Sequence, residues 1–263
     1  MIAGDLTSLP NVKSWLGIST TNDDVQLTRL ISAASQYVQS WMNRQFAVVT
    51  KTEARNGTGT AMMALGDWPV VSISSLVVNG TAIVQSIDGV AAGYVFDSRM
   101  LYLIGYIFPM GLQNVKVTYT VGYQKTNEAA TIQSTPSYTL DPATLSLPWS
   151  GGLSVSFASG VALTKVTAAP TAGQYSLLSS GGLWTYTFSA ADAGKAILLT
   201  YMYTPPEIEQ ACIELISLRY RERSRIGENS KSIGGETVSF NVKDFPEGVK
   251  TILNNYRRVI SVY

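Results

Sequence analysis

The sequence predicts an α+β protein, with helices near both ends of the chain and strands between them. Three observations support this fold class. Apolar residues recur every three or four positions over residues 24–44 and 206–220, as on an amphipathic helix. Residues 47–123 alternate apolar and polar side chains between turn dipeptides, as strands do. Residues 126–204 form short apolar runs among Ser, Thr and Gly and carry only five charges.

The composition limits the classes of protein that fit. A chain of 263 residues is long enough for one large domain or two smaller ones. Charged residues make up 14%, below the usual share of about a quarter. A chain with so few charges suits β-rich surfaces and large subunit interfaces, where charge is costly to bury. The net charge of +1 gives no strong field to attract nucleic acid or an anionic membrane.

The sequence offers no catalytic or metal-binding pattern. It holds one cysteine, Cys212, and no histidine, which excludes most zinc sites, Ser-His-Asp triads and haem ligation. Cys212 lies on an apolar helix face, so we expect a buried side chain rather than a reactive thiol. No phosphate-binding loop is present, and the paired carboxylates stand at helix starts. We therefore expect no catalytic residue, no cofactor and no metal.

The N-terminal segment predicts two helices. Residues 9–17 form a short helix that ends at Gly17. A long helix follows to about Arg44, with N-cap oxygens from residues 20–22 and acidic residues in its first turn. One face of this helix is apolar and is expected to face the core: Leu27, Leu30, Ile31, Ala34, Tyr37, Val38, Trp41 and Met42.

Five strands are predicted in residues 47–123. Asn79-Gly80 lies between two apolar runs, which predicts a two-residue hairpin turn. The strands are Val48–Glu53, Ser72–Val78, Ile83–Ile87, Met100–Ile104 and Val115–Val121.

Residues 126–204 predict an all-β region. Five short strands at intervals of roughly ten residues indicate a small β-sandwich of immunoglobulin type. Trp184, Tyr186 and Phe188 alternate and would share one face. A core face is the favoured interpretation, and a sugar-binding platform is the alternative.

Helix returns at Pro205-Pro206, where proline is tolerated. Two apolar stripes on this helix predict that it is buried between neighbours, from the same chain or another subunit. Its end carries Arg219, Arg221, Arg223 and Arg225, which suit either a solvated helix end or a partner contact. Gly227 is the expected C-cap.

The chain after this helix predicts a hairpin and a last helix. Ser232–Phe240 reads as a hairpin with Gly234-Gly235 at its bend. Asp244 is the expected N-cap of the last helix, with Pro246 at the second helical position and Glu247 at N3. The inner face of that helix is Val249, Ile252, Leu253 and Tyr256.

The N-terminus lacks the cationic and apolar regions of a signal peptide. No apolar run reaches about 18 residues, so we expect no membrane span. These features predict a protein made and kept in a cytoplasm.

Three blocks of sequence resemble one family. They are LPNVKSWLGI with NDDVQLTRLISAASQYVQSWMNRQF, then GYIFPMGLQNVKVTYTVGY, then PPEIEQACIELISLRYRERSRIGENSKSIGGETVSF with PEGVKTILNNYRR. In this order they are similar to the head–tail connector proteins of tailed bacteriophages, also called adaptor or head-completion proteins. The resemblance implies a discontinuous, largely helical connector core with a small β block (residues 1–125 and 205–263). Residues 126–204 would be an inserted β-sandwich domain.

The resemblance also implies a function. Such proteins are structural virion components, not enzymes, and form a ring, usually of twelve subunits, in the neck of the particle. The ring lies between the portal and a tail-completion or tail-tube protein, and double-stranded DNA passes through it without sequence recognition. No membrane is involved, and the protein would be made in the host bacterial cytoplasm.

The family resemblance and their positions make several residues candidate partner contacts. Phe245–Tyr263 would dock into the portal, and the hairpin Lys231–Phe240 would face the channel or the tail. Removal of residues 246–263 is expected to leave a folded protein. The candidate contacts are Arg219, Arg221, Arg223, Arg225, Lys231, Gly234, Gly235, Arg257, Arg258 and Tyr263.

A second class of function stays open. In this alternative the chain is a tail or baseplate component, and its β insert recognises a glycan on the host surface. An enzymatic function has no sequence feature behind it.

Overall fold

The computed structural model describes residues 4–180, 183–223, 230–233, 236–239 and 245–258. It divides into two compact units. Unit 1 comprises Met1–Arg44 and Lys125–Tyr263, and unit 2 comprises Gln45–Gln124. The predicted domain division at residues 126 and 204 stays a prediction. Among the described residues, no helix is both long and apolar enough to cross a membrane.

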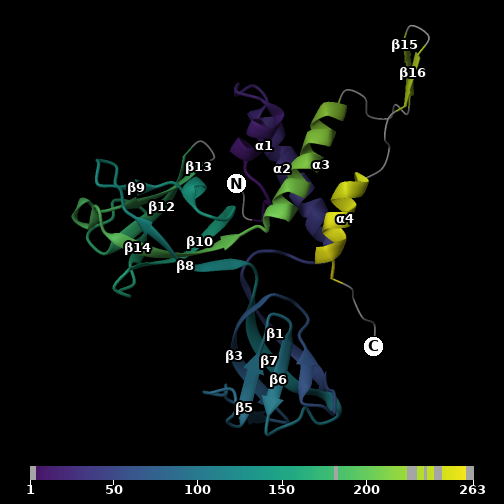
Figure 1. Ribbon diagram of the computed structural model, residues 1–263, viewed down its shortest axis with the longest axis vertical. Helices are drawn as coiled ribbons and strands as arrows, with labels where there is room; N and C mark the ends of the chain where they lie inside the picture. Colours follow the sequence, from purple (N-terminus) through teal and green to yellow (C-terminus); the bar gives the residue numbers. More distant parts are fainter. Residues whose placement is uncertain (1–3, 181–182, 224–229, 234–235, 240–244, 259–263) are drawn as a thin grey trace. The chain divides into compact units, whose positions relative to one another are not determined.

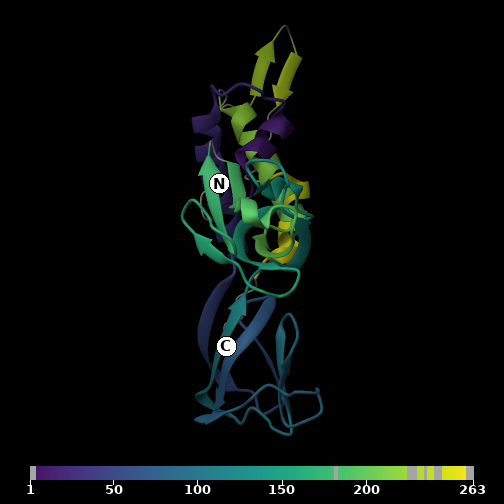
Figure 2. The same ribbon diagram turned by 90° about the vertical axis from the view of Figure 1, so that its left-hand side faces the viewer.

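Unit 1 contains four helices in its described part: α1 (Leu9–Leu16), α2 (Asp24–Met42), α3 (Pro206–Glu222) and α4 (Glu247–Tyr256). α2 and α3 lie side by side, and α4 packs against both (Figures 1 and 2). Buried apolar side chains of this layer come from all four helices, among them Val12, Leu27, Ile31, Ala34, Val38, Met42, Ile208, Ala211, Leu215, Val249 and Leu253.

The two N-terminal helices agree with the sequence prediction, apart from one cap. Ser8 Oγ accepts the backbone N–H of Asn11 at the start of α1, and Gly17 ends that helix with φ 71°. α2 ends at Met42, followed by Asn43 in the left-handed conformation. The expected N-cap at residues 20–22 is wrong, because Asp23 holds that position.

Both predicted apolar stripes of α3 are buried, and the helices that cover them belong to the same chain. α1, α2 and α4 all pack against it. Ile208, Cys212 and Ile216 on it are completely buried in the single subunit. The prediction that this helix is buried between neighbours is therefore confirmed, and those neighbours belong to the same chain.

The C-terminal part of the chain contains the predicted hairpin and last helix, with one difference in where the helix begins. Strands β15 (Ser230–Ile233) and β16 (Glu236–Ser239) pair antiparallel, which confirms the hairpin. α4 begins at Glu247 with Pro246 as its N-cap residue, so the predicted start at Asp244 is wrong. Asp244, Gly227 and the Gly234-Gly235 bend lie outside the described residues.

Apart from the β15–β16 hairpin, the described β part of unit 1 consists of two sheets. One has the strand order β10-β14-β8 and the other β11-β12-β13-β9. They share one apolar cluster, with Val155 and Leu199 from the first sheet and Tyr175, Tyr186 and Phe188 from the second. The strands are β8 (Gln124–Thr131), β9 (Thr139–Leu140), β10 (Trp149–Phe157), β11 (Thr164–Val166), β12 (Gln174–Ser180), β13 (Leu183–Phe188) and β14 (Ala196–Tyr203).

This region confirms the five predicted strands and adds two. β8 escaped prediction because its sequence, QKTNEAAT, has no apolar alternation, and pairing within the sheet rather than propensity makes it a strand. Tyr186 and Phe188 are core residues, as the favoured interpretation predicted, whereas Trp184 is only half-buried. The immunoglobulin-like topology stays a prediction.

Unit 2 is a small all-β unit with two sheets. Their strand orders are β1-β7-β3-β4 and β2-β6-β5. Leu76, Val117 and Tyr119 from the first sheet share one apolar cluster with Met63 and Leu101 from the second. The strands are β1 (Val49–Gly57), β2 (Met62–Ala64), β3 (Val70–Val78), β4 (Thr81–Ala82), β5 (Gly93–Phe96), β6 (Met100–Ile104) and β7 (Gly111–Val121).

The predicted turn at Asn79-Gly80 is confirmed, with φ values of 48° and 80° between the paired residues Val78 and Thr81. The predicted strand Ile83–Ile87 is wrong. Only Gln85 forms a bridge there, to Tyr94, while Val84 and Ile87 are exposed. The two short strands β2 and β5 were missed.

Candidate functional site

A row of two arginines and three aromatic rings crosses the helical layer of unit 1. The Arg219 guanidinium lies 4.8 Å from the centre of the Tyr37 ring, and the Arg257 guanidinium lies 4.8 Å from that of Trp41. Phe245 lies between the two rings. It stacks on Tyr37 at 4.9 Å and meets Trp41 edge-on at 5.5 Å. We call these five residues the Arg–aromatic row.

Three helices position the row. Tyr37 and Trp41 are four residues apart on α2, so they lie on the same side of that helix. Arg219 comes from the last turn of α3, Phe245 from the residue before Pro246, and Arg257 from the residue that ends α4. Each stacked arginine contributes on the order of 0.5–1 kcal/mol at a partly exposed site. The row therefore ties the ends of α3 and α4 to α2.

The row keeps positive charge at the surface. Phe245 is buried, Tyr37 and Trp41 are half-buried, and Arg257 is exposed. An arginine stacked on a ring keeps its N–H donors free to bind a carboxylate or a phosphate. The structure thus brings two of the predicted contact residues, Arg219 and Arg257, onto one aromatic platform.

The other two described arginines at the end of α3, Arg221 and Arg223, differ in their contacts. Arg223 folds back on its own helix, where Nη1 donates to the Tyr220 carbonyl at 2.7 Å and the guanidinium lies 3.9 Å from the Tyr220 ring centre. Arg221 is exposed, and it has no hydrogen bond, ion pair or ring contact with any described residue. Of the described arginines at this helix end, Arg221 is therefore the one best placed to meet a partner.

The remaining predicted contacts are only partly described. The backbone N–H of Arg258 donates to the Met42 carbonyl at 2.9 Å, which joins the chain after α4 to the end of α2. Lys231 lies in β15 opposite Val238. Arg225, Gly234, Gly235 and Tyr263 lie outside the described residues.

Sequence reasoning missed the three rings of the row as functional residues. It assigned Tyr37 and Trp41 to the core face of α2, and it treated Phe245 only as part of a docking segment. The sequence does contain a pattern that could have indicated the row. Two aromatic residues lie four positions apart on one helix, and arginines lie at the ends of two other helices. Only the packing of α4 shows that Phe245 fills the space between those rings.

The described residues hold no catalytic arrangement. No group of three or more acidic, Cys or His side chains among them could hold a metal ion. Burial raises the pKa of the Cys212 thiol to about 12, so the thiol stays protonated and unreactive. The expectation of a buried, structural cysteine is confirmed.

A match to a protein family gives the class of this protein. A family described as "Head completion protein" matches residues 5–134 and 151–259, and the chain belongs to this family. Its members are structural components of virus particles, so the protein is not an enzyme. The match includes most of residues 126–204, the segment that the sequence analysis treated as an insertion.

Three solved structures are similar over the whole length. They are described as the neck of an empty gene transfer agent particle (TM-score 0.39), the virion of a native gene transfer agent particle (0.40) and the neck of a native particle computed with C12 symmetry (0.38). Each shares 14% identity, and the alignment covers 100% of this chain and 98% of the other. No curated protein sequence matches the chain.

Proposed function

We propose that the protein is a subunit of a ring in the neck of a tailed phage-like particle, between the portal and the tail. The ring extends the DNA channel, and its far side offers the surface for tail attachment. The observation that carries this proposal is the family match over nearly the whole chain. A dodecamer, made in the host cytoplasm and built into the virion, is the form we propose.

Several surface properties support a role in assembly. Eight large apolar side chains of unit 2 are exposed: Met62, Val84, Ile87, Val90, Tyr106, Ile107, Met110 and Leu112. Part of this surface is hollowed between Val78, Ile83, Leu103, Tyr106 and Ile107. Exposed apolar side chains beside a hollow, such as Tyr106 and Ile107 here, are typical of protein interfaces. DNA must slide through the ring, and a near-neutral chain adds little phosphate affinity to a channel wall.

The Arg–aromatic row and the segment Phe245–Tyr263 are the surface that we propose for the portal. Val249 and Leu253 of α4 are completely buried, so this helix belongs to the folded core. Deletion of residues 246–263 would remove that core as well as any docking residues. The earlier expectation of a folded truncated protein does not hold for this structure, and point variants are the appropriate test.

Joining of heads to tails tests the proposal. DNA-filled heads that lack this protein are mixed with tails and with purified protein, and intact particles are counted by electron microscopy. We expect the unaltered protein to restore joining and to form a ring in images of the neck. Arg257→Glu should reduce joining, whereas Lys165→Glu, at an exposed lysine of β11, should not. Particles that join equally well without the protein would refute the proposal.

The glycan-binding alternative gains no support. Of the three alternating aromatic residues of β13, Tyr186 and Phe188 are buried in the core of the β region. A platform of three exposed rings therefore does not exist on this strand.

A further inference from the structure

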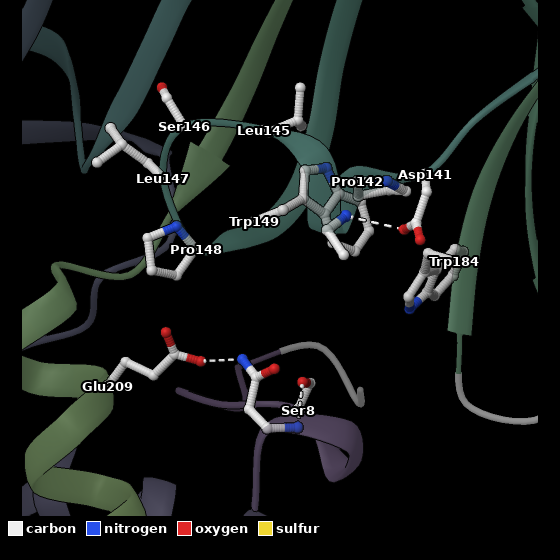
Figure 3. Close-up of a pocket in the computed structure, with 12 residues that line it drawn as sticks. Ser8, Asp141, Pro142, Leu145, Ser146, Leu147, Pro148, Trp149, Trp184 and Glu209 are labelled. Carbon is white, nitrogen blue, oxygen red and sulfur yellow. Dashed lines mark hydrogen bonds between the residues drawn. The ribbon is translucent and has the colours of Figure 1, made fainter. Parts of the chain in front are cut away.

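A cavity of about 320 Å³ opens in unit 1 between the helices and the β region (Figure 3). Glu209 of α3 and Ser8 border it on one side, and Asp141, Trp149 and Trp184 border it on the other. The volume lies at the lower end of the range for ligand pockets, enough for one side chain or a small molecule.

The side chains that line the cavity suit a cation. Its lining includes two carboxylates and two indole rings but no lysine or arginine. The two indoles lie 5.7 Å apart between ring centres, and the Trp149 Nε1–H donates to the Tyr186 hydroxyl, which fixes that ring. Indole faces and carboxylates are the groups that bind a guanidinium or an ammonium group.

Glu209 is a buried carboxylate at the edge of this cavity. The side chain is only 9% exposed, although it lies in the first turn of α3. Asn11 Nδ2 (2.7 Å) and Thr7 Oγ1 (3.0 Å) both donate to its Oε1. Its Oε2 accepts no hydrogen bond from a described residue, and no described cation forms an ion pair with the group. A buried carboxylate with an unused oxygen at a cavity calls for a donor from outside.

The chain itself supplies a fitting donor. Among the arginines of the described residues, only Arg29 and Arg221 lack any hydrogen bond, ion pair or ring contact there. Arg221 lies at the end of α3, twelve residues beyond Glu209, which corresponds to about 18 Å along a helix. One straight helix cannot bring its own two ends together, so the contact must join two copies. A contact between two different patches is heterologous and repeats head to tail.

We propose that this cavity receives the Arg221 side chain of a neighbouring copy, with the guanidinium against the indoles of Trp149 and Trp184 and paired with Glu209. Each subunit then uses the start of α3 as acceptor and the end of α3 as donor. The proposal rests on the proposed ring, since it names the contact that closes it.

Cysteine cross-linking of the full-length protein tests the contact. Ser146→Cys places a thiol on the exposed rim of the cavity, and Arg221→Cys places one at the donor. With a short bis-maleimide, the double variant should give a ladder of cross-linked oligomers, in solution at high concentration or in assembled necks. Arg29→Cys with Ser146→Cys is the matched control and should give no ladder. The natural Cys212 is buried and does not compete.

Charge variants give a second readout. Arg221→Glu and Glu209→Gln should each weaken self-association on the order of tenfold or more, measured by analytical ultracentrifugation. Arg29→Glu should leave it unchanged. Circular dichroism checks that each variant is folded. A ladder with Arg29→Cys, or cross-links only to another virion protein, would overturn the assignment of Arg221.

The two proposals can fail separately. If rings appear in imaged necks but no cross-link forms through Arg221, the proposed function stands and this contact is wrong. If the cross-linked ladder forms but heads gain no tails, the contact stands and the role in tail joining is wrong.

Discussion

The Phe245 ring stacks on the Tyr37 ring with 4.9 Å between ring centres and 14° between the ring planes. These residues are 208 positions apart in the chain. The contact fixes the segment before α4 against the middle of α2, and the same ring meets Trp41 edge-on. Arg219 and Arg257 each stack on one of the two α2 rings, so loss of Phe245 would also disturb the surface that carries both cations.

Phe245→Ala tests this central position. The ring is buried, so its removal should lower the free energy of unfolding by about 3–5 kcal/mol. Chemical denaturation followed by circular dichroism at 222 nm measures the change. Val25→Ala is the control, because Val25 is 86% exposed on α2 and should change stability by less than about 0.5 kcal/mol. Equal effects of the two variants would show that Phe245 does not anchor α4.

Ser35→Ala tests a buried polar contact in the helical layer. Ser35 Oγ accepts the Leu6 backbone N–H at 2.9 Å and lies 3.7 Å from Cys212 Sγ. The variant leaves a buried N–H without an acceptor, which should cost about 1–3 kcal/mol in chemical denaturation. Ser40→Ala, at an exposed position of the same helix, should be nearly neutral. A neutral Ser35→Ala would mean that the Leu6 N–H finds another acceptor.

Cys212 should resist alkylation in the folded protein. Burial raises its pKa to about 12, so the reactive thiolate is scarce at pH 8, and the side chain is also inaccessible. Mass spectrometry after iodoacetamide treatment should detect labelling only in denaturant. Labelling of the native protein at the rate of a free thiol would contradict the burial of this face of α3.

Two glycines should respond to alanine in opposite directions. Gly80 has φ 80° in the turn between β3 and β4, where alanine is strained, so Gly80→Ala should lower stability by about 1 kcal/mol. Gly248 lies in α4, and a Cβ there meets nothing within 4 Å. Gly248→Ala should raise stability by about 0.4–1 kcal/mol. Thermal unfolding measures both, and a stabilising Gly80→Ala would refute the assigned turn.

Glu209 should give stability a distinct pH dependence. Burial raises its pKa above the ordinary value of 4.5, and the hydrogen bonds from Asn11 and Thr7 partly oppose this. The folded state then binds the proton more tightly than the unfolded state. Its destabilising effect is full above the folded-state pKa and disappears as the pH falls to 4.5 and below.

Glu209→Gln removes this charge and keeps an acceptor for Asn11 and Thr7. The variant should melt at a higher temperature than the unaltered protein at pH 8, and the difference should shrink as the pH falls toward 4.5. The same variant should self-associate more weakly, so stability and assembly move in opposite directions. A variant that is less stable at pH 8 would show that the carboxylate is already compensated in the single subunit.

The sequence by itself determined the local structure of this protein. Apolar spacing predicts α2 and α3, Gly17 ends α1, and Asn79-Gly80 makes its turn, because each depends on residues close together in the chain. The absence of histidine and the single buried cysteine excluded most catalytic chemistry, and the blocks of sequence indicated the family. Predictions failed where local signals are weak, as for β8, or ambiguous, as for Ile83–Ile87.

Only the tertiary structure decided how distant segments combine. It showed that the chain itself buries both apolar stripes of α3, so those stripes are not a free interface. It placed Phe245 between Tyr37 and Trp41, and it gathered Glu209 with Trp149 and Trp184 around one cavity. Such sets join residues tens to hundreds of positions apart, and their proximity follows from how helices and sheets pack, which no local pattern encodes.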